Sequence, residues 1–341
     1  MMGAFTKKTG VYYLVNAALV LLLFFVLLTF INNGVISRTS TGILTLVCIN
    51  ITLAVSLNLV TGILGQLVLG HAGFMLVGAY TAALFTKNCG LDLNIAFPIG
   101  LVLAGIAAAL FGIVIGIPAL RLRGDYLAII TLGFGEIIRV IANNLKITNG
   151  AMGLSDIKSL SSLKNPSPMF VYSYAIAALV IFIMFTFTRS RHGRAVIAIR
   201  EDEIAAEAMG INTTYYKLFA FVLAAFIAGV AGGVFAHQIG IIDPSKFDFG
   251  RSVEILIMVV LGGMGSITGS IISATVLTWL PEQLRGFSQY RLLVYSIILI
   301  IVMLFKPSGL LGRYEISIPA LLEKLYRKIS KKPAQTGTGG A

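Results

Sequence analysis

The chain has 341 residues, of which 57% are hydrophobic and 12% are charged, and its formal net charge is +12. Soluble domains carry about 25% charged residues, so this composition excludes a soluble globular protein and indicates a polytopic membrane protein. The basic residues lie beside apolar stretches, where they set topology and contact lipid, so we do not expect nucleic acid as a partner. Two cysteines and three widely separated histidines predict no disulfide framework, metal site or cofactor.

The first apolar stretch, residues 11–31, follows Lys7 and Lys8 and is long enough to cross a bilayer. It is longer than the apolar core of a signal peptide and has no clear cleavage site, so we expect a retained span behind a cytoplasmic N-terminus of residues 1–10. A second span is expected over residues 42–60. Its polar residues recur at near-helical spacing and predict a face toward protein or a transport pathway; they are Asn50, Thr52, Ser56 and Asn58.

Glycine recurs through residues 61–74, just before another apolar stretch at 75–85. Frequent glycine weakens a continuous helix, so we expect a broken helix whose irregular backbone is buried in protein or lines a cavity. Close packing of continuous helices through small residues explains the glycines equally well. Gln66 and His71 are candidates for a transport pathway, although a hydrogen-bonded structural histidine is the commoner role for such a residue.

Residues 96–117 form the next expected span, and residues 127–143 re-enter the membrane after a charged turn. Glu136 and Arg139 are three residues apart in this second span, so they share a helical face and can form an ion pair. Ionisable residues inside a span are candidates for a transport pathway. The same pair can instead anchor the helix bundle.

A polar loop at residues 145–169 precedes expected spans at 170–187 and 218–235. Between these spans, residues 189–217 must lie in water, because each of their charged side chains would cost about 2.5–3.5 kcal/mol at the centre of a membrane. Apolar residues recur there at roughly helical spacing and predict one short amphipathic helix that ends near Gly210; they are Val196, Ile199, Ile204, Ala208 and Ile211. The alternative is a solvated loop between spans.

Residues 252–280 are apolar but contain a second glycine-rich interruption at 262–269, with a spacing loosely similar to that of 62–70. The similarity suggests two repeated halves with broken helices. A last span is expected at 292–305, followed by a basic, partly disordered cytoplasmic tail at 313–341.

With the N-terminus in the cytoplasm, 16 lysine and arginine residues fall on the cytoplasmic side and 9 on the outer side, in agreement with the positive-inside rule. This orientation requires residues 252–280 to return to the side they left, as a re-entrant hairpin or two short spans. The predicted fold is an all-α transmembrane bundle with about eight to ten membrane segments, some of them glycine-rich broken or re-entrant helices, in one domain at residues 11–312.

The string Ala205-Ala206-Glu207-Ala208-Met209-Gly210 resembles the Ala-Ala-x-x-x-Gly signature of ABC-importer permeases, whose coupling helix sits in a cleft of the ATP-binding subunit. The longer string GRAVIAIREDEIAAEAMGIN at residues 193–212 is similar to LivM-type permeases of branched-chain amino acid ABC importers. Further blocks that resemble this family lie at 65–74, 122–136, 149–154, 262–269 and 306–312.

The resemblance implies a permease subunit of the bacterial or archaeal plasma (inner) membrane that imports branched-chain amino acids or a similar small amide or amino acid. The implied partners are two ABC ATPase subunits, a second homologous permease subunit and an extracytoplasmic substrate-binding protein. The chain has no phosphate-binding loop motif, so ATP hydrolysis is expected on separate partner chains, and this chain is expected to be a transport subunit and not an enzyme. In the coupling segment (residues 189–217), the residues implied in contact with the ATPase are Glu201, Glu203, Ala205, Ala206, Glu207 and Gly210.

Two other classes of function are alternatives to an ATP-driven permease. A secondary transporter could use Glu136, Arg139 or His71 in proton coupling, and broken helices suit that class as well. Such a carrier needs no coupling segment, which favours the ATP-driven permease. An intramembrane enzyme would need a nucleophile with a base, or a metal cluster, and the sequence offers neither.

Overall fold

The computed structural model describes residues 18–122, 124–161 and 167–283, and beyond them residues 296, 297, 300, 304–306, 309–312 and 315. The expected N-terminus at 1–10 and, apart from residue 315, the tail at 313–341 lie outside this range, as does most of the expected last span. Regular structure in the described residues is helical, with one isolated antiparallel bridge between Leu154 and Ile242.

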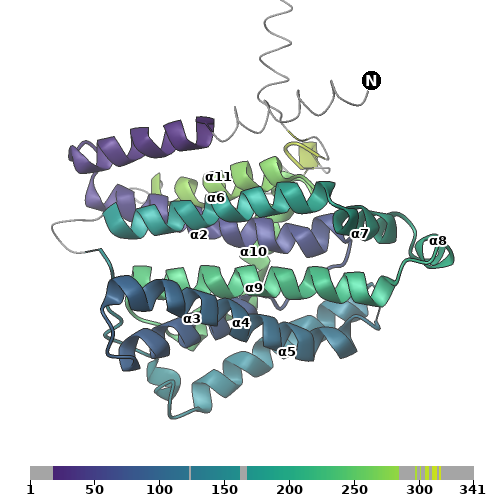
Figure 1. Cartoon of the computed structure of the whole chain (residues 1–341), viewed down its shortest axis with the longest axis horizontal. Coiled ribbons are helices and arrows are strands. Elements are labelled where there is room, and N and C mark those ends of the chain that lie inside the picture. Colours follow the sequence, from purple (N-terminus) through teal and green to yellow (C-terminus); the bar gives the residue numbers. More distant parts are fainter. Residues whose placement is uncertain are drawn as a thin grey trace, which may run out of the picture.

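Most of the helices form a bundle in which their long axes run roughly side by side (Figure 1). The described part of the first helix is Ala18–Asn32. It is followed by α2 (Arg38–Asn58), a π-helical turn (Leu59–Ile63), α3 (His71–Asn88), α4 (Leu93–Ala119), α5 (Asp125–Asn144), α6 (Ser167–Arg189), α7 (Arg191–Glu201), α8 (Glu203–Ala208), α9 (Thr213–Ile239), α10 (Phe249–Gly262) and α11 (Ile267–Gln283).

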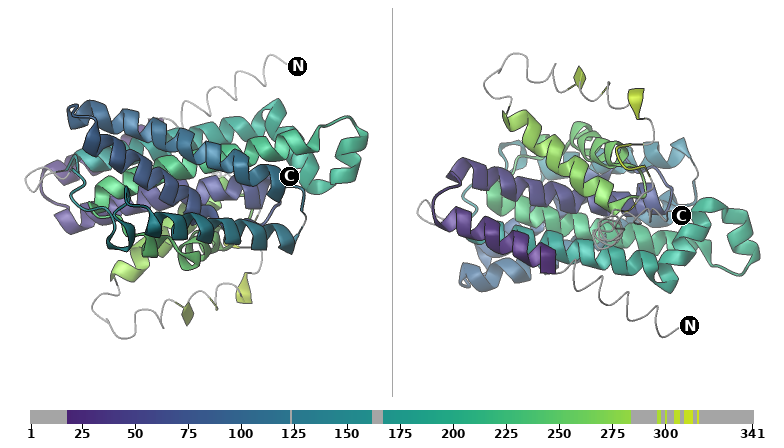
Figure 2. Two further views of the ribbon diagram at one scale, coloured as in Figure 1. Left: turned by 90° about the horizontal axis from the view of Figure 1, so that it is seen from below. Right: turned by 90° about the horizontal axis from the view of Figure 1, so that it is seen from above.

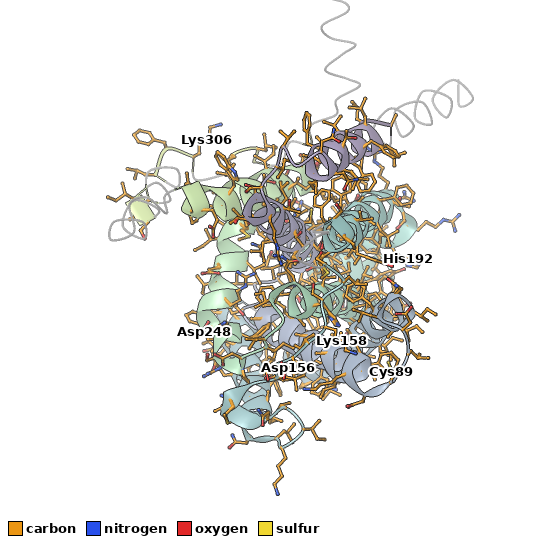
Figure 3. All side chains as sticks on the ribbon, turned by 90° about the vertical axis from the view of Figure 1, so that its left-hand side faces the viewer. Cys89, Asp156, Lys158, His192, Asp248 and Lys306 are labelled. Carbon is orange, nitrogen blue, oxygen red and sulfur yellow. The ribbon has the colours of Figure 1, made fainter. Side chains whose placement is uncertain are left out.

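Four of these helices are long and apolar enough to cross a membrane: Arg38–Ile63, Leu93–Ala119, Ser167–Arg189 and Thr213–Ile239. The expected all-helical membrane bundle is therefore confirmed in its class. The number of eight to ten membrane segments stays a prediction, because the remaining described helices are shorter or more polar. Seen along the bundle from the end that carries Cys89, Asp156 and Lys158, carbon-rich side chains project from most of its perimeter (Figure 3), as expected of a surface in contact with lipid.

Helix α2 lies at the centre, packed against α6, α9, α10 and α11. The polar face predicted on this helix contacts protein, because all four of its polar residues are buried. Asn50 donates to the Thr278 hydroxyl of α11 at 2.8 Å, and the hydroxyl of Ser56 lies 2.8 Å from Nε2 of His71. Burial of these groups is tolerated because each has a hydrogen-bond partner.

Helices α3, α4 and α9 form a closely packed layer, which small residues make possible. A Cβ atom added to Gly78 of α3 would lie 2.0 Å from the carbonyl oxygen of Gly229 in α9, closer than any real contact. The C-terminal end of α4 packs against the start of α9, where a Cβ on Gly116 would lie 2.8 Å from Leu218. Arg121, which follows α4, and the coupling segment are therefore at the same end of the bundle, as the predicted orientation requires.

The first glycine-rich interruption is a break in a helix, as predicted. After the π-helical turn, residues 64–70 are not helical, and α3 starts at His71. Helix α5 supports this irregular backbone: the Leu69 N–H donates to the Thr131 hydroxyl at 3.1 Å, and a Cβ on Gly70 would lie 2.0 Å from the Thr131 carbonyl oxygen. Continuous helices through residues 61–74 are thereby excluded.

The second interruption reverses the chain. Helices α10 and α11 are antiparallel, because Gly262 packs against Gly269 and, further along, the Ser273 hydroxyl donates to the Met258 carbonyl. The turn at residues 263–266 includes Gly265, whose φ of +92° favours glycine. Residues 252–280 thus return toward the end from which they came, which the predicted orientation needed.

Candidate functional site

The coupling segment projects from one end of the bundle (Figures 1 and 2). The prediction of one amphipathic helix was wrong: the segment contains two helices, α7 and α8, divided at Asp202. Asp202 has an extended backbone (φ −156°, ψ 111°), and its carboxylate accepts hydrogen bonds from the N–H groups of Ile204 at 2.9 Å and Ala205 at 3.0 Å. An aspartate that caps a helix start in this way cannot also continue the preceding helix.

Helix α7 is held firmly against the end of α6. Val196 and Ile199 are buried, and Ser190 caps the helix by accepting the N–H of Gly193 at 3.1 Å. A Cβ on Gly193 would lie 2.1 Å from the Phe187 carbonyl oxygen, so only glycine fits this turn. Helix α7 is therefore joined to the end of α6 by a tight, packed turn.

Helix α8 presents an exposed tip. Ile204 is 71% and Met209 83% exposed, and Ala205, Glu207 and Gly210 are exposed beside them. Of the six residues implied by the resemblance, Ala206 is the one buried. Two large apolar side chains are thus left uncovered on a projecting, otherwise charged segment.

Gly210 ends α8 with a φ of +83°, and a Cβ there would meet no atom within 4 Å. Its N–H donates to Glu207 at 2.9 Å, and the N–H of Ile211 donates to Ala206 at 3.1 Å. These two bonds form a Schellman motif, in which glycine is favoured for its backbone conformation.

The acidic residues of the coupling segment differ in their ion-pair partners and in their exposure. Glu203 forms an ion pair with Lys217 of α9, with Nζ and Oε2 2.7 Å apart, and the Lys217 side chain is only 4% exposed. Glu201 pairs with Arg200, whereas Glu207 is exposed at the tip. Lys217 and Arg200 were not predicted as internal partners, because basic residues near spans are usually topogenic.

Glu136 and Arg139 form the predicted ion pair, with Arg139 Nη2 2.7 Å from Glu136 Oε2. The other oxygen of Glu136 accepts the N–H of Phe249, the first residue of α10, at 3.0 Å.

Helix α10 carries a second ion pair at the same spacing, Arg251 with Glu254 at 2.9 Å. Arg251 also donates to Asn50 of α2 at 2.7 Å. The spacing of Arg251 and Glu254 is the sequence signal that could have identified this second pair.

These two ion pairs mark the face made by α5 and α10. The side chains of Glu136 and Glu254 are 30% and 56% exposed, although both helices lie among apolar ones. Charged groups at membrane depth are costly in lipid. We therefore expect these charged side chains to face protein or water and not lipid.

The other two predicted pathway residues do not join this cluster. His71 is buried and bonded to Ser56 of α2, which is the structural role considered for it. Gln66 lies in the broken segment, where its N–H donates to the Val60 carbonyl at 2.9 Å. Its buried Oε1 accepts no hydrogen bond from the part of the chain that the structure describes.

Comparison with known proteins finds a match to the family model described as branched-chain amino acid transport system / permease component, over residues 39–305. The chain is 39% identical over 304 residues to the high-affinity branched-chain amino acid transport system permease protein LivM of Salmonella typhimurium, covering 81% of this chain and 71% of LivM. It is 37% identical over 145 residues to LivH of Escherichia coli, covering 42% and 45% of the two chains. A probable LivM of Methanocaldococcus jannaschii is 24% identical over 66% of this chain and 72% of its own.

Proposed function

This chain belongs to the family of permease components of branched-chain amino acid transport systems, and we propose that it is the membrane subunit of an ATP-driven ABC importer that carries these amino acids into the cytoplasm. The observation that supports this most is the exposed tip of α8, which is tied to α9 by the Glu203–Lys217 ion pair. A permease that worked alone would have no use for such a tip.

The proposed partners follow from the need for energy and substrate. ATP hydrolysis takes place on two separate ATPase subunits, one of which receives α8. A second homologous permease completes the membrane part, since this chain is similar to both LivM and LivH. An extracytoplasmic binding protein delivers the amino acid at the end opposite α8.

The transport pathway runs along the α5 and α10 face, between this chain and the second permease. The two ion pairs suit a water-filled path for a zwitterion, because a charged ammonium and carboxylate need polar contacts at membrane depth. Within each ion pair the two charges neutralise each other, so the path itself offers weak selectivity. The binding protein therefore selects the ligand.

In this mechanism, closure of the ATPases on ATP displaces α8. The Glu203–Lys217 pair passes the displacement to the start of α9, and the α6–α7 turn at Gly193 passes it to α6. Both helices are long enough to cross the membrane, so a displacement at one end tilts them and opens the path on the far side.

Gentle extraction from native membranes, followed by mass spectrometry of the co-purifying chains, tests the proposal. We expect two ATPases with phosphate-binding loops and a second permease. A protein that purifies alone, and that transports after reconstitution without ATP, would establish a secondary transporter instead.

A further inference from the structure

Arg200 connects the coupling segment to both glycine-rich breaks. It leaves the last turn of α7, and its Nη1 donates to the Gly62 carbonyl oxygen at 2.9 Å. A Cβ on Gly65 would lie 2.5 Å from the Arg200 Cγ, and a Cβ on Gly265 would lie 3.2 Å from Nη1. Larger residues at these glycines would therefore displace the arginine.

The two breaks that Arg200 touches are joined to each other by Asn58. The Asn58 side chain donates to the Ser266 carbonyl at 3.0 Å and accepts the N–H of Gly265 at 2.9 Å. A Cβ on Gly62 would lie 2.2 Å from the Gly265 nitrogen. Residues more than 200 positions apart in the chain thus form one compact junction, which we call the break junction: Asn58, Gly62, Gly65, Gly265 and Ser266.

The inward position of Arg200 distinguishes it from other basic residues of α7. Its side chain is 19% exposed, whereas Arg191 and Arg194 are exposed. Its other guanidinium nitrogens bind the carboxylate of Glu201, next to the α8 cap at Asp202. One side chain therefore contacts the α8 side of the segment and the break junction at the same time.

The Arg200 side chain also borders a cavity. Among the residues that the structure describes, this cavity has a volume of about 220 Å³, with Ile63, Ile197 and Gly265 among the lining residues. Arg200 therefore contacts the break junction on one side and the cavity on another.

We propose that Arg200 is a positioning residue that transmits movement of the coupling segment to the break junction, and so links ATP hydrolysis to the opening of the two broken helices. The inference rests on the proposed function of the chain as an ATPase-driven permease. It adds a second route, distinct from the α6 and α9 connections, which acts on the irregular backbone between the membrane helices.

The test uses the complete complex, purified with its ATPases and reconstituted with its binding protein, and measures both leucine uptake and ATP hydrolysis. Arg200→Gln removes the charge and the forked contact to Glu201. We expect it to hydrolyse ATP but to lower uptake per ATP by about fivefold or more, the low end of the range for coupling between two sites. Arg200→Lys keeps the charge and one donor for the Gly62 carbonyl, so its uptake per ATP should lie between those of the wild type and Arg200→Gln.

Arg121→Gln is the matched control, because Arg121 is an exposed arginine at the same end of the bundle outside the coupling segment. Its ratio of uptake to ATP hydrolysis should equal that of the wild type. The role of Arg200 would be overturned if uptake per ATP is unchanged in Arg200→Gln, or if uptake and hydrolysis fall by the same factor in both Arg200 variants. Either result would leave the proposed function of the chain intact. A wild-type complex that contains no ATPase would overturn the proposed function and this inference with it.

Discussion

The ammonium of Lys217 lies 2.7 Å from the carboxylate of Glu203, and the lysine side chain is almost completely buried between α8 and α9. A buried charge needs its partner, because an unpaired ammonium in this position loses its hydration without compensation. The pair therefore fixes the projecting α8 to a helix that is long enough to cross the membrane.

Glu203→Gln should weaken the attachment of α8 by about 1–3 kcal/mol, the cost of leaving a buried donor poorly satisfied. The expected result is a lower thermal stability of the complex and a loss of leucine uptake. The double variant Glu203→Gln with Lys217→Met should recover much of the stability, because no buried charge is then left unpaired. A double variant as unstable as the sum of the two single ones would show that the two residues are not coupled.

Gly210→Ala should strain the end of α8 by about 1–2 kcal/mol, because alanine disfavours a left-handed backbone. Gly90 is a matched control: it also has a positive φ, +63°, and open space around its Cβ position, but it lies in the turn between α3 and α4. Both variants should lose similar stability in thermal denaturation. Uptake per ATP should fall in Gly210→Ala alone, and an equal fall in Gly90→Ala would remove the special role of the α8 end.

Glu136→Gln should reduce uptake, since it leaves Arg139 without its anionic partner while a side-chain oxygen can still accept the Phe249 N–H. Adding Arg139→Gln should restore part of the activity, because the pathway face is then neutral. Uptake by proteoliposomes should need ATP and show no response to an imposed proton gradient. A proton-driven uptake that Glu136→Gln abolishes would instead support a secondary transporter.

Gly78→Ala should destabilise the layer of α3, α4 and α9 by about 1–3 kcal/mol, the usual cost of overpacking, because the new methyl group would meet the Gly229 backbone. Gly133→Ala in α5 meets no atom within 4 Å and should leave the melting temperature unchanged or slightly raised. Equal melting temperatures for the two variants would contradict the close packing of α3 on α9.

Hydropathy and glycine frequency predicted the helical class and the break after α2, because both are local properties of the sequence. The division between α7 and α8 was missed, since Asp202 was counted as one more charge in an amphipathic pattern although its side chain caps a new helix. The predicted pair of Glu136 with Arg139 was found because three-residue spacing fixes a shared helical face. Arg251 and Glu254 have the same spacing, but the apolar stretch was expected to begin at residue 252, between them, so they were not considered as a pair.

Sequence patterns do not predict the contacts between segments that are distant in the chain. Asn58 meets Gly265 and Ser266 only because α2 and α11 pack together. Arg200 and Lys217 have the positions typical of topogenic charges. Nothing in their spacing reveals that Arg200 binds a backbone carbonyl of the π-helical turn or that Lys217 binds a carboxylate of α8.

Site-specific photo-crosslinking can show whether α8 docks an ATPase. A photoreactive residue placed at Met209, which is 83% exposed at the α8 tip, is compared in native membranes with one placed at Met152, which is 86% exposed at the opposite end of the bundle. We predict an adduct with an ATPase subunit from position 209 and none with that subunit from position 152. Absence of the ATPase adduct at position 209, or the same adduct from both positions, would show that α8 is not the docking site of the ATPase.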